Sequence, residues 1–220
     1  MYRQPEPEFM DLPDEAAAYA AADFSGVNAA FVGRLLELAG DATTARAVDL
    51  GTGPADIAIR VARARPGWVI DAVDGAAAMI EIAHRAVAAA GVSTRIRLHL
   101  ADAKHTGLAG GGYDVVFSNS LLHHLPDPLP WWHEIRRLAR PGAVIFIRDL
   151  FRPASPDAAR AIVQQHAGGE SELLRKEFYR SLLAAFTVEE VREQLAAAGL
   201  AELTLQPYSD RHLDVFGRMS

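Results

Sequence analysis

The chain has 220 residues, enough for one ordinary domain and too few for two full-sized ones. Half of the residues (50%) are hydrophobic and 23% are charged, so the chain can build a core and lacks the composition of a disordered protein. A formal charge of −6 argues against a nucleic-acid partner, and the absence of cysteine excludes disulfides, thiolate zinc sites and thiol catalysis.

The first residues, 1–13, are rich in carboxylates and prolines and contain no apolar run, which predicts neither a signal peptide nor a membrane anchor. No segment approaches the ~20 apolar residues of a spanning helix. We therefore expect a cytoplasmic protein with no membrane partner, present as a monomer or homodimer.

Helical patterns follow at residues 14–19 and 27–39.

From residue 45 onward, short apolar runs alternate with alanine-rich helical stretches, which is typical of βαβ units and a parallel sheet with helices on both faces. The predicted strands are 45–50, 68–73, 95–100, 113–118 and 143–149. The predicted helices between them are 55–65, 75–90 and 128–139. Pro141 and Gly142 are expected to form the turn into the fifth strand.

After the fifth strand, residues 155–184 have a helical pattern interrupted at Gly168 and Gly169. A capping box at 187–190 opens the last helix, and residues 201–207 and 212–218 read as a terminal hairpin. The sequence thus predicts a single domain, 1–220. Its expected parts are a helical cap (1–44), a cofactor-binding core (45–150), a helical insertion over the pocket (151–186), and a final helix and hairpin (187–220).

The sharpest local motif is the stretch 47–56, AVDLGTGPAD, a strand that ends in a glycine-rich turn and opens a helix. Glycines let the backbone bend tightly and let a ligand approach the main chain, and the helix N-terminus offers free amides. Asp74 lies 21 residues after Gly53, at the end of the second strand, where a carboxylate can accept both hydroxyls of a ribose. The combination indicates a nucleoside-containing ligand.

A dinucleotide site is the first alternative for this motif. It requires a third glycine at position 56, where the helix passes a pyrophosphate. The residue there is Asp56, whose carboxylate would be repelled by the pyrophosphate. The motif therefore favours another nucleoside over a nicotinamide cofactor.

The order of motifs resembles the class I S-adenosylmethionine-dependent methyltransferases. The stretch VDLGTGP at 48–54 is similar to the first motif of that family, AVDG at 72–75 to the second, and ADA at 101–103 to the third. Residues 113–128 and 138–142 resemble the fourth strand with its following turn and the lead into the fifth strand. The family often has glycine at positions 55 and 143, where this chain has alanine. The resemblance implies a Rossmann-like, mostly parallel seven-stranded sheet that ends in an antiparallel hairpin.

The resemblance also implies which residues bind the methionine half of S-adenosylmethionine. Asp49, Gly51 and Gly53 would surround it, and Asn119, at the end of the fourth strand, would lie beside the amino-acid portion and the sulfonium. Tyr19 is a further candidate for the cofactor carboxylate, with simple packing as the alternative.

For the adenosine half, Asp74 would hold the ribose hydroxyls. Gly75 and Met79 would flank the adenosine, and Asp102 with Ala103 would meet the adenine edge. S-adenosylhomocysteine would be the product that leaves this site.

A sulfonium methyl group is already activated, so the protein must mainly align a nucleophile behind it, and a base is needed only for a neutral hydroxyl or a protonated amine. His123 and His124 are the candidates for such a base. Consecutive helical positions point ~100° apart, so at most one of them faces the pocket. The alternative is that the pair only packs and caps a turn.

Two residues are candidates for binding the acceptor. Arg148, at the end of the fifth strand, would hold an anionic group, with an ion pair inside the protein as the alternative. Tyr179 would line the inner face of the insertion, although its neighbours look like core. The eight histidines show no metal-ligand spacing, so the sequence predicts no metal.

The leading interpretation is an enzyme that moves the methyl group of S-adenosylmethionine to a small-molecule acceptor by in-line displacement. The alternatives are a non-catalytic module that only binds S-adenosylmethionine, a nicotinamide-dependent oxidoreductase, and a transferase acting on RNA or protein. The negative charge weakens the RNA alternative.

Overall fold

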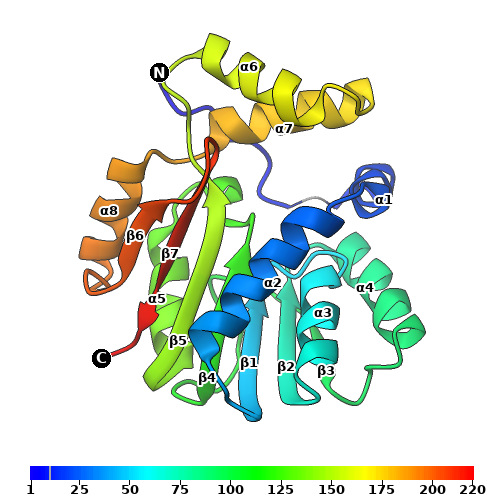
Figure 1. Cartoon of the computed structure of the whole chain (residues 1–220), viewed down its shortest axis with the longest axis vertical. Helices are drawn as coiled ribbons and strands as arrows, with labels where there is room; N and C mark the ends of the chain where they lie inside the picture. Colours follow the sequence, from blue (N-terminus) through cyan, green and yellow to red (C-terminus); the bar gives the residue numbers. More distant parts are fainter. Residues whose placement is uncertain (10) are drawn as a thin grey trace.

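The computed structural model describes residues 1–9 and 11–220 and is built around one seven-stranded sheet in the order β3-β2-β1-β4-β5-β7-β6 (Figure 1). The strands are β1 (Thr44–Leu50), β2 (Gly67–Asp74), β3 (Ile96–Leu100), β4 (Tyr113–Asn119), β5 (Ala139–Leu150), β6 (Thr204–Pro207) and β7 (His212–Arg218). The first five strands pair in parallel, whereas β7 runs antiparallel to both β5 and β6. The predicted Rossmann-like sheet with a terminal antiparallel hairpin is confirmed.

Helices cover both faces of the sheet, as predicted (Figure 1). They are α1 (Pro13–Ala21), α2 (Ser25–Ala39), α3 (Asp56–Ala64), α4 (Ala77–Ala89), the 3₁₀ turn η1 (Leu122–His124), α5 (Leu129–Leu138), α6 (Pro156–Ala167), α7 (Glu172–Ala184) and α8 (Val188–Ala197). One face packs against α2, α3 and α4, and the other packs against α5 and α8.

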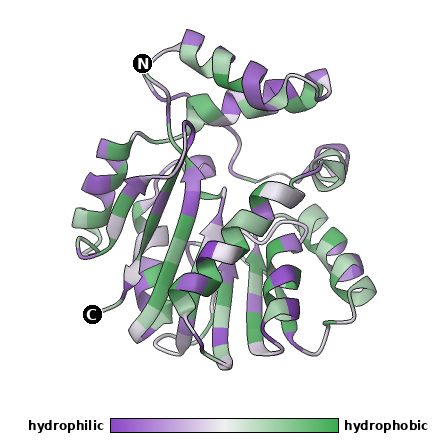
Figure 2. Cartoon of the chain, viewed as in Figure 1, coloured by the Kyte–Doolittle hydropathy of each residue, from purple (hydrophilic) through white to green (hydrophobic). Residues whose placement is uncertain are grey.

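The central strands alternate their side chains between these two apolar layers. In β1, Ala47 packs in the layer of α2 and α3, and the next residue, Val48, packs in the layer of α5 and α8. Because successive strand side chains point to opposite faces, a strand buried on both sides must be apolar at nearly every position. The mostly green strands in Figure 2 show this pattern.

Several predicted boundaries were wrong, among them the start of the first hairpin strand, which is Thr204 rather than residue 201. The fifth strand begins at Ala139 rather than at residue 143, because Ala139 already pairs with Tyr113 before an irregularity shifts the register. Gly142 therefore lies inside β5, with a φ of 77°. The fourth helix begins at Ala77 rather than at residue 75, because the Asp74 carboxylate accepts a hydrogen bond from the backbone of Ala76 (2.9 Å) and holds a turn there.

The capping box of the last helix is present as predicted. The Thr187 side chain accepts from the backbone N–H of Glu190 (3.2 Å), and the Glu190 carboxylate accepts from the backbone N–H of Thr187 (2.7 Å). Glu190 also pairs with Arg152 at 2.7 Å, which ties the start of α8 to the segment after β5. Among residues 1–9 and 11–220, no helix combines the length and apolar character needed to cross a membrane.

Residues 1–9 form an extended segment, here called the strap, that runs past α7 toward α1 across the end of the sheet where β1, β4 and β5 finish (Figure 1). Arg3 anchors the strap, because its guanidinium donates to the carbonyl oxygens of Ala184 (2.5 Å), His123 (2.9 Å) and Leu125 (2.8 Å). The same guanidinium lies 3.8 Å from the centre of the Phe186 ring. The insertion and the strap thus cover the carboxyl edge of the sheet together.

Strand β7 is joined to β5 by a buried ion pair. The Arg148 guanidinium donates two hydrogen bonds of 2.7 Å to the Asp214 carboxylate, and both side chains are almost completely buried. The central carbon of the Arg148 guanidinium also lies 3.5 Å from the centre of the Tyr208 ring. Arg148 is therefore fully engaged within the hairpin, which is the ion-pair alternative raised from the sequence, and we withdraw it as an acceptor-binding residue.

Removing one partner of this buried pair should be costly. We expect Asp214→Asn to lower the free energy of unfolding by about 3–5 kcal/mol, because the Arg148 charge would stay buried without its partner. Urea denaturation of both proteins measures the difference. Asp157→Asn, which breaks the exposed pair with Arg160, is the matched control and should leave the urea midpoint unchanged. A variant as stable as the parent chain would contradict the structural role of the pair.

Candidate active site

The turn after β1 is shaped by close packing and by left-handed backbone conformations. Gly51 has a φ of 76°, and a Cβ atom there would lie 3.0 Å from the Leu121 side chain. The amides of Gly51 and Thr52 both donate to the carbonyl oxygen of Val73 at 2.9 Å, which fastens the turn to β2. Ala55, at a position where the related family often has glycine, also adopts a positive φ (66°).

Asp49 lies at the end of β1 and is only 2% exposed. In the described part of the chain, the donor to its side chain is the Thr52 hydroxyl, at 2.8 Å. Burial raises the pKa of Asp49 to about 7, and the nearby Asp74 carboxylate adds to the rise. Asp49 is thus a buried carboxylate whose charge is poorly compensated by the protein, which fits a cationic ligand group beside it.

Asp74 ends the neighbouring strand and braces the same turn. Its carboxylate accepts from the backbone N–H of Gly53 at 2.7 Å and from that of Ala76 at 2.9 Å. Burial nevertheless raises the pKa of Asp74. The 21-residue spacing seen in the sequence therefore corresponds to direct contact between the glycine turn and the second acidic residue.

The predicted adenosine-binding residues follow along β2 and β3. Met79 is buried in a small cluster with Ala16 and Ala76, against which Tyr19 packs. Asp102 accepts from the backbone N–H of Lys104 at 2.8 Å and pairs with the Lys104 ammonium at 3.1 Å. Ala103, between them, is buried.

The strap lies against these same residues. A side chain at Gly75 would collide with the Phe9 ring, and the Lys104 ammonium pairs with Glu8 as well as with Asp102. The two residues of the strap thus cover the predicted adenosine region. Their position was missed from the sequence, because an acidic and proline-rich terminus carries no periodic pattern.

The histidine pair lies in η1, at the carboxyl ends of β4 and β5. The His123 Nδ1 atom is 2.5 Å from the Asp149 carboxylate, and the Asp149 carboxylate also accepts from the backbone N–H of Leu122 at 2.6 Å. His123 and Asp149 are both buried (4% and 0% exposed). Because a carboxylate only accepts, Nδ1 carries the proton and Nε2 points away from Asp149.

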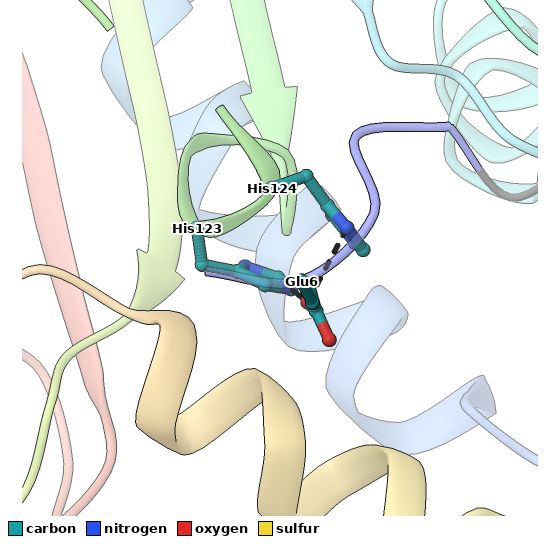
Figure 3. A group of neighbouring side chains, drawn as sticks. All are labelled: Glu6, His123 and His124. Carbon is teal, nitrogen blue, oxygen red and sulfur yellow. Dashed lines mark ion pairs between the residues drawn. The ribbon is translucent and has the colours of Figure 1, made fainter. Parts of the chain in front are cut away.

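Glu6 of the strap lies beside both histidines, as Figure 3 shows. Its Oε1 atom is 3.5 Å from His123 Nε2 and 3.3 Å from His124 Nδ1. The Ser181 hydroxyl of α7 donates to the same carboxylate at 3.2 Å. A side chain from the first ten residues thus joins the insertion to the predicted bases.

Burial and neighbouring charges shift the pKa values of Glu6, His123 and His124. Burial raises the pKa of Glu6, with the His123 charge opposing that shift. Burial alone would lower the pKa of His123, but the Asp149 and Glu6 carboxylates outweigh it and raise the pKa. Burial and the neighbouring His123 lower the pKa of His124 to about 3, so His124 is neutral at pH 7.

The structure brings most of the predicted residues to one edge of the sheet. These are Asp49, Gly51, Gly53, Asp74, Gly75, Asn119, His123 and His124, from the ends of β1, β2 and β4 and the turns that follow them. Tyr179 lies elsewhere, because it packs with α6 and its hydroxyl is 3.4 Å from Arg160. The structure therefore gives no support to Tyr179 as an acceptor-binding residue.

Comparison with known proteins identifies the kind of domain that carries this site. Residues 47–142 match the family model described as a methyltransferase domain. Residues 47–142 thus form a methyltransferase domain of the kind found in the class I S-adenosylmethionine-dependent family. Enzymes of this family use S-adenosylmethionine as the methyl donor. The matched range contains the glycine turn, Asp74, Asp102 and the histidine pair.

Two curated methyltransferases are similar to part of the chain. The 27-O-demethylrifamycin SV methyltransferase of Amycolatopsis mediterranei (strain S699) is 30% identical over 159 residues, which cover 70% of this chain and 53% of that protein. The release factor glutamine methyltransferase of Chlorobaculum tepidum is 41% identical over 75 residues, covering 33% of this chain and 26% of that protein. The chain thus spans about half, or less, of the length of these relatives.

A solved structure shows the same methyltransferase fold. The S-adenosylmethionine-dependent methyltransferase from Aquifex aeolicus aligns over 95% of this chain and 99% of its own, with a TM-score of 0.70 and 16% identity. At this level of identity the comparison supports the fold alone.

The raised pKa of Asp49 makes a prediction about stability. A carboxyl group whose pKa is higher in the folded than in the unfolded protein stabilises the fold at low pH, and this contribution is lost as the pH rises from about 4 through about 7. We expect Asp49→Asn to raise the free energy of unfolding above that of the parent chain, and to do so by about 2 kcal/mol more at pH 8 than at pH 5.

Urea denaturation at the two pH values measures this difference, with the exposed Asp41→Asn as the matched control. Equal effects of Asp49→Asn at pH 5 and pH 8 would show that Asp49 is ionised throughout this range.

Proposed function

We propose that this chain transfers the methyl group of S-adenosylmethionine to a small-molecule acceptor by in-line displacement. The observation that carries the proposal is the poorly compensated Asp49 carboxylate at the end of β1, directly beside the Gly51–Gly53 turn that Asp74 braces. These groups suit a ligand that combines a cationic amino acid with a nucleoside.

The methionine half would lie at the ends of β1 and β4. The Asp49 carboxylate would pair with the ligand ammonium. This pairing would lower the pKa of Asp49 again and would offset the unfavourable free energy of burying its charge. The turn glycines would let the ligand carboxylate approach the backbone amides at the start of α3. Asn119, half-buried at the end of β4, would lie beside the sulfonium.

The adenosine half would lie over β2 and β3. Asp74 would accept hydrogen bonds from the ribose hydroxyls, Gly75 and Met79 would flank the adenosine, and Asp102 with Ala103 would meet the adenine edge. Because Phe9 covers Gly75, the strap must shift at Phe9 when adenosine enters. The strap thus covers the proposed cofactor site at Gly75.

When bound, S-adenosylmethionine supplies the methyl group of its sulfonium. S-adenosylhomocysteine leaves after the acceptor has taken that methyl group. The protein then has two tasks, to hold the acceptor in line and to exclude water. The strap and α7 cover the carboxyl edge and suit the second task. Transfer to a neutral acceptor also needs a group that removes a proton.

His123 is the residue we propose for that proton transfer. Asp149 holds Nδ1–H, so in the neutral ring Nε2, 3.5 Å from Glu6 Oε1, is the atom that accepts a proton, and the carboxylates of Asp149 and Glu6 stabilise the imidazolium that forms. His124 is the poorer base because its pKa is about 3. This assignment agrees with the prediction that at most one of the pair acts on the acceptor.

The charges near the site favour a neutral or cationic small acceptor. The carboxylates of Glu6, Asp49, Asp74 and Asp149 lie around the edge and outnumber the Arg3 and Lys104 cations there, and the nearby Arg148 guanidinium is fully paired with Asp214. A polyanion would be repelled by this field. The rifamycin methyltransferase among the relatives is named for a small-molecule acceptor, which supports the same class.

Calorimetric titration tests the cofactor site. We expect S-adenosylmethionine and S-adenosylhomocysteine to bind, NADH not to bind, and Asp74→Ala to weaken S-adenosylmethionine at least tenfold, about 1.4 kcal/mol. The exposed Asp41→Ala is the control and should bind like the parent chain. Undiminished affinity of Asp74→Ala would refute the placement of the ribose.

A radiolabelled methyl-transfer assay on a panel of small hydroxyl and amine acceptors tests the chemistry. We expect Asp149→Asn to lower turnover at least tenfold with little change in the dissociation constant of S-adenosylmethionine, because the base loses its orientation. His123→Gln should have the same phenotype, and the exposed His133→Gln should not. Binding without transfer to any acceptor would instead support a non-catalytic module.

A further inference from the structure

The group formed by Glu6, His123 and His124 has the composition of a metal site. Two imidazoles and one carboxylate are the ligands that Zn²⁺ and similar divalent ions take in catalytic centres. One ligand atom from each residue lies within 4.8 Å of the others, and Figure 3 shows Glu6 beside the two rings, whose centroids are 4.3 Å apart. The sequence predicted no metal, because Glu6 is 117 residues away from His123 and no short motif joins them.

The distances fit a single cation better than they fit direct hydrogen bonds. On a tetrahedral ion with bonds of about 2.1 Å, neighbouring ligand atoms are about 3.4 Å apart. The Glu6 Oε1 atom is 3.5 Å from His123 Nε2 and 3.3 Å from His124 Nδ1. Charge-assisted hydrogen bonds are usually 2.7–2.9 Å, and the His123–Asp149 contact is shorter still, at 2.5 Å.

The surroundings of the group hold its ligands in place. Asp149 binds the Nδ1–H of His123, so the lone pair of Nε2 is directed to the side of Glu6, and such a carboxylate behind a histidine is a recurrent partner of bound metals. Ser181 donates to the Glu6 carboxylate at 3.2 Å, and Arg3 fastens the strap to the carbonyl of His123. His123 and Glu6 are therefore positioned before any ion arrives, whereas His124 Nδ1 lies 3.3 Å from the Pro7 carbonyl oxygen and must give up that contact to bind an ion.

We propose that Glu6, His123 and His124 bind one divalent transition-metal ion of the Zn²⁺ class, with His123 through Nε2, His124 through Nδ1 and Glu6 through Oε1. Three protein ligands leave one position for water or another ligand, which is the pattern of catalytic rather than structural zinc. The ion would link the strap to η1 and so fix the cover of the sheet edge.

The ion would also change how the acceptor is activated, and this consequence rests on the proposed function. Nε2 of His123 would be a ligand instead of a base. A hydroxyl bound at the open position would have a lower pKa because of the metal charge, and it would release its proton to solvent water before taking the methyl group. Asp149 would keep its positioning role in either form, since it orients the same imidazole.

Calorimetric titration of the untagged full chain with ZnCl₂ tests the site, with Co²⁺ absorption as a second readout of coordination. We expect one ion per chain, tetrahedral-type visible bands with Co²⁺, and at least tenfold weaker Zn²⁺ binding in Glu6→Gln and in His124→Gln. The exposed Glu15→Gln and His133→Gln are matched controls and should bind like the parent chain. Circular dichroism checks that each variant is folded.

No saturable Zn²⁺ binding by the parent chain, or equal affinity in the site variants and their controls, would overturn the proposal. The titration contains neither S-adenosylmethionine nor an acceptor. A chain that binds S-adenosylmethionine but not Zn²⁺ would therefore refute the metal site alone, whereas binding of Zn²⁺ without S-adenosylmethionine would refute the proposed function and leave the metal site standing.

Discussion

The contact between Asp149 and His123 is the constraint on which the site depends. The Asp149 carboxylate is completely buried at the end of β5 and accepts from the His123 ring, from the backbone of Leu122 and from its own neighbour Leu150. It therefore fixes the turn after β4 as well as the orientation of the imidazole. A buried carboxylate is stable only when it is paired or hydrogen-bonded in this way. Glu6 Oε1 lies 3.5 Å from Nε2 of His123, and Asp149 fixes this contact because it holds the orientation of the ring.

The edge of the sheet combines this group with a second one built on Asp49 and Asp74. Both carboxylates end parallel strands at the middle of the sheet, and burial raises both pKa values. Parallel strands bring their carboxyl ends to the same edge, which is where ligands of open α/β sheets bind. The protein thus concentrates negative charge where a cationic cofactor is expected, whereas the positive charge of Arg148 is paired with Asp214 in the hairpin.

Local patterns in the sequence predicted the fold, and they selected residues that the structure places together at one edge of the sheet. Alternating strands and helices, the glycine turn and the terminal hairpin are short-range signals, and each corresponds to an element of the structure. The Arg148 interpretation failed because its partner, Asp214, is 66 residues away and only the pairing of β5 with β7 reveals it. Glu6 and Phe9 were missed for the same reason, since an extended strap has no periodicity and its contacts are all long-range.

The tautomer of His123 is the most direct test of this account, because both proposed roles of the ring need a free Nε2. Nitrogen-15 NMR of the histidine side chains at alkaline pH reads it. We expect a strongly deshielded proton on Nδ1, an unprotonated Nε2 that shifts when Zn²⁺ or S-adenosylmethionine is added, and loss of this pattern in Asp149→Asn. A proton on Nε2 of the neutral ring would contradict the account, because the ring could then act neither as base nor as ligand.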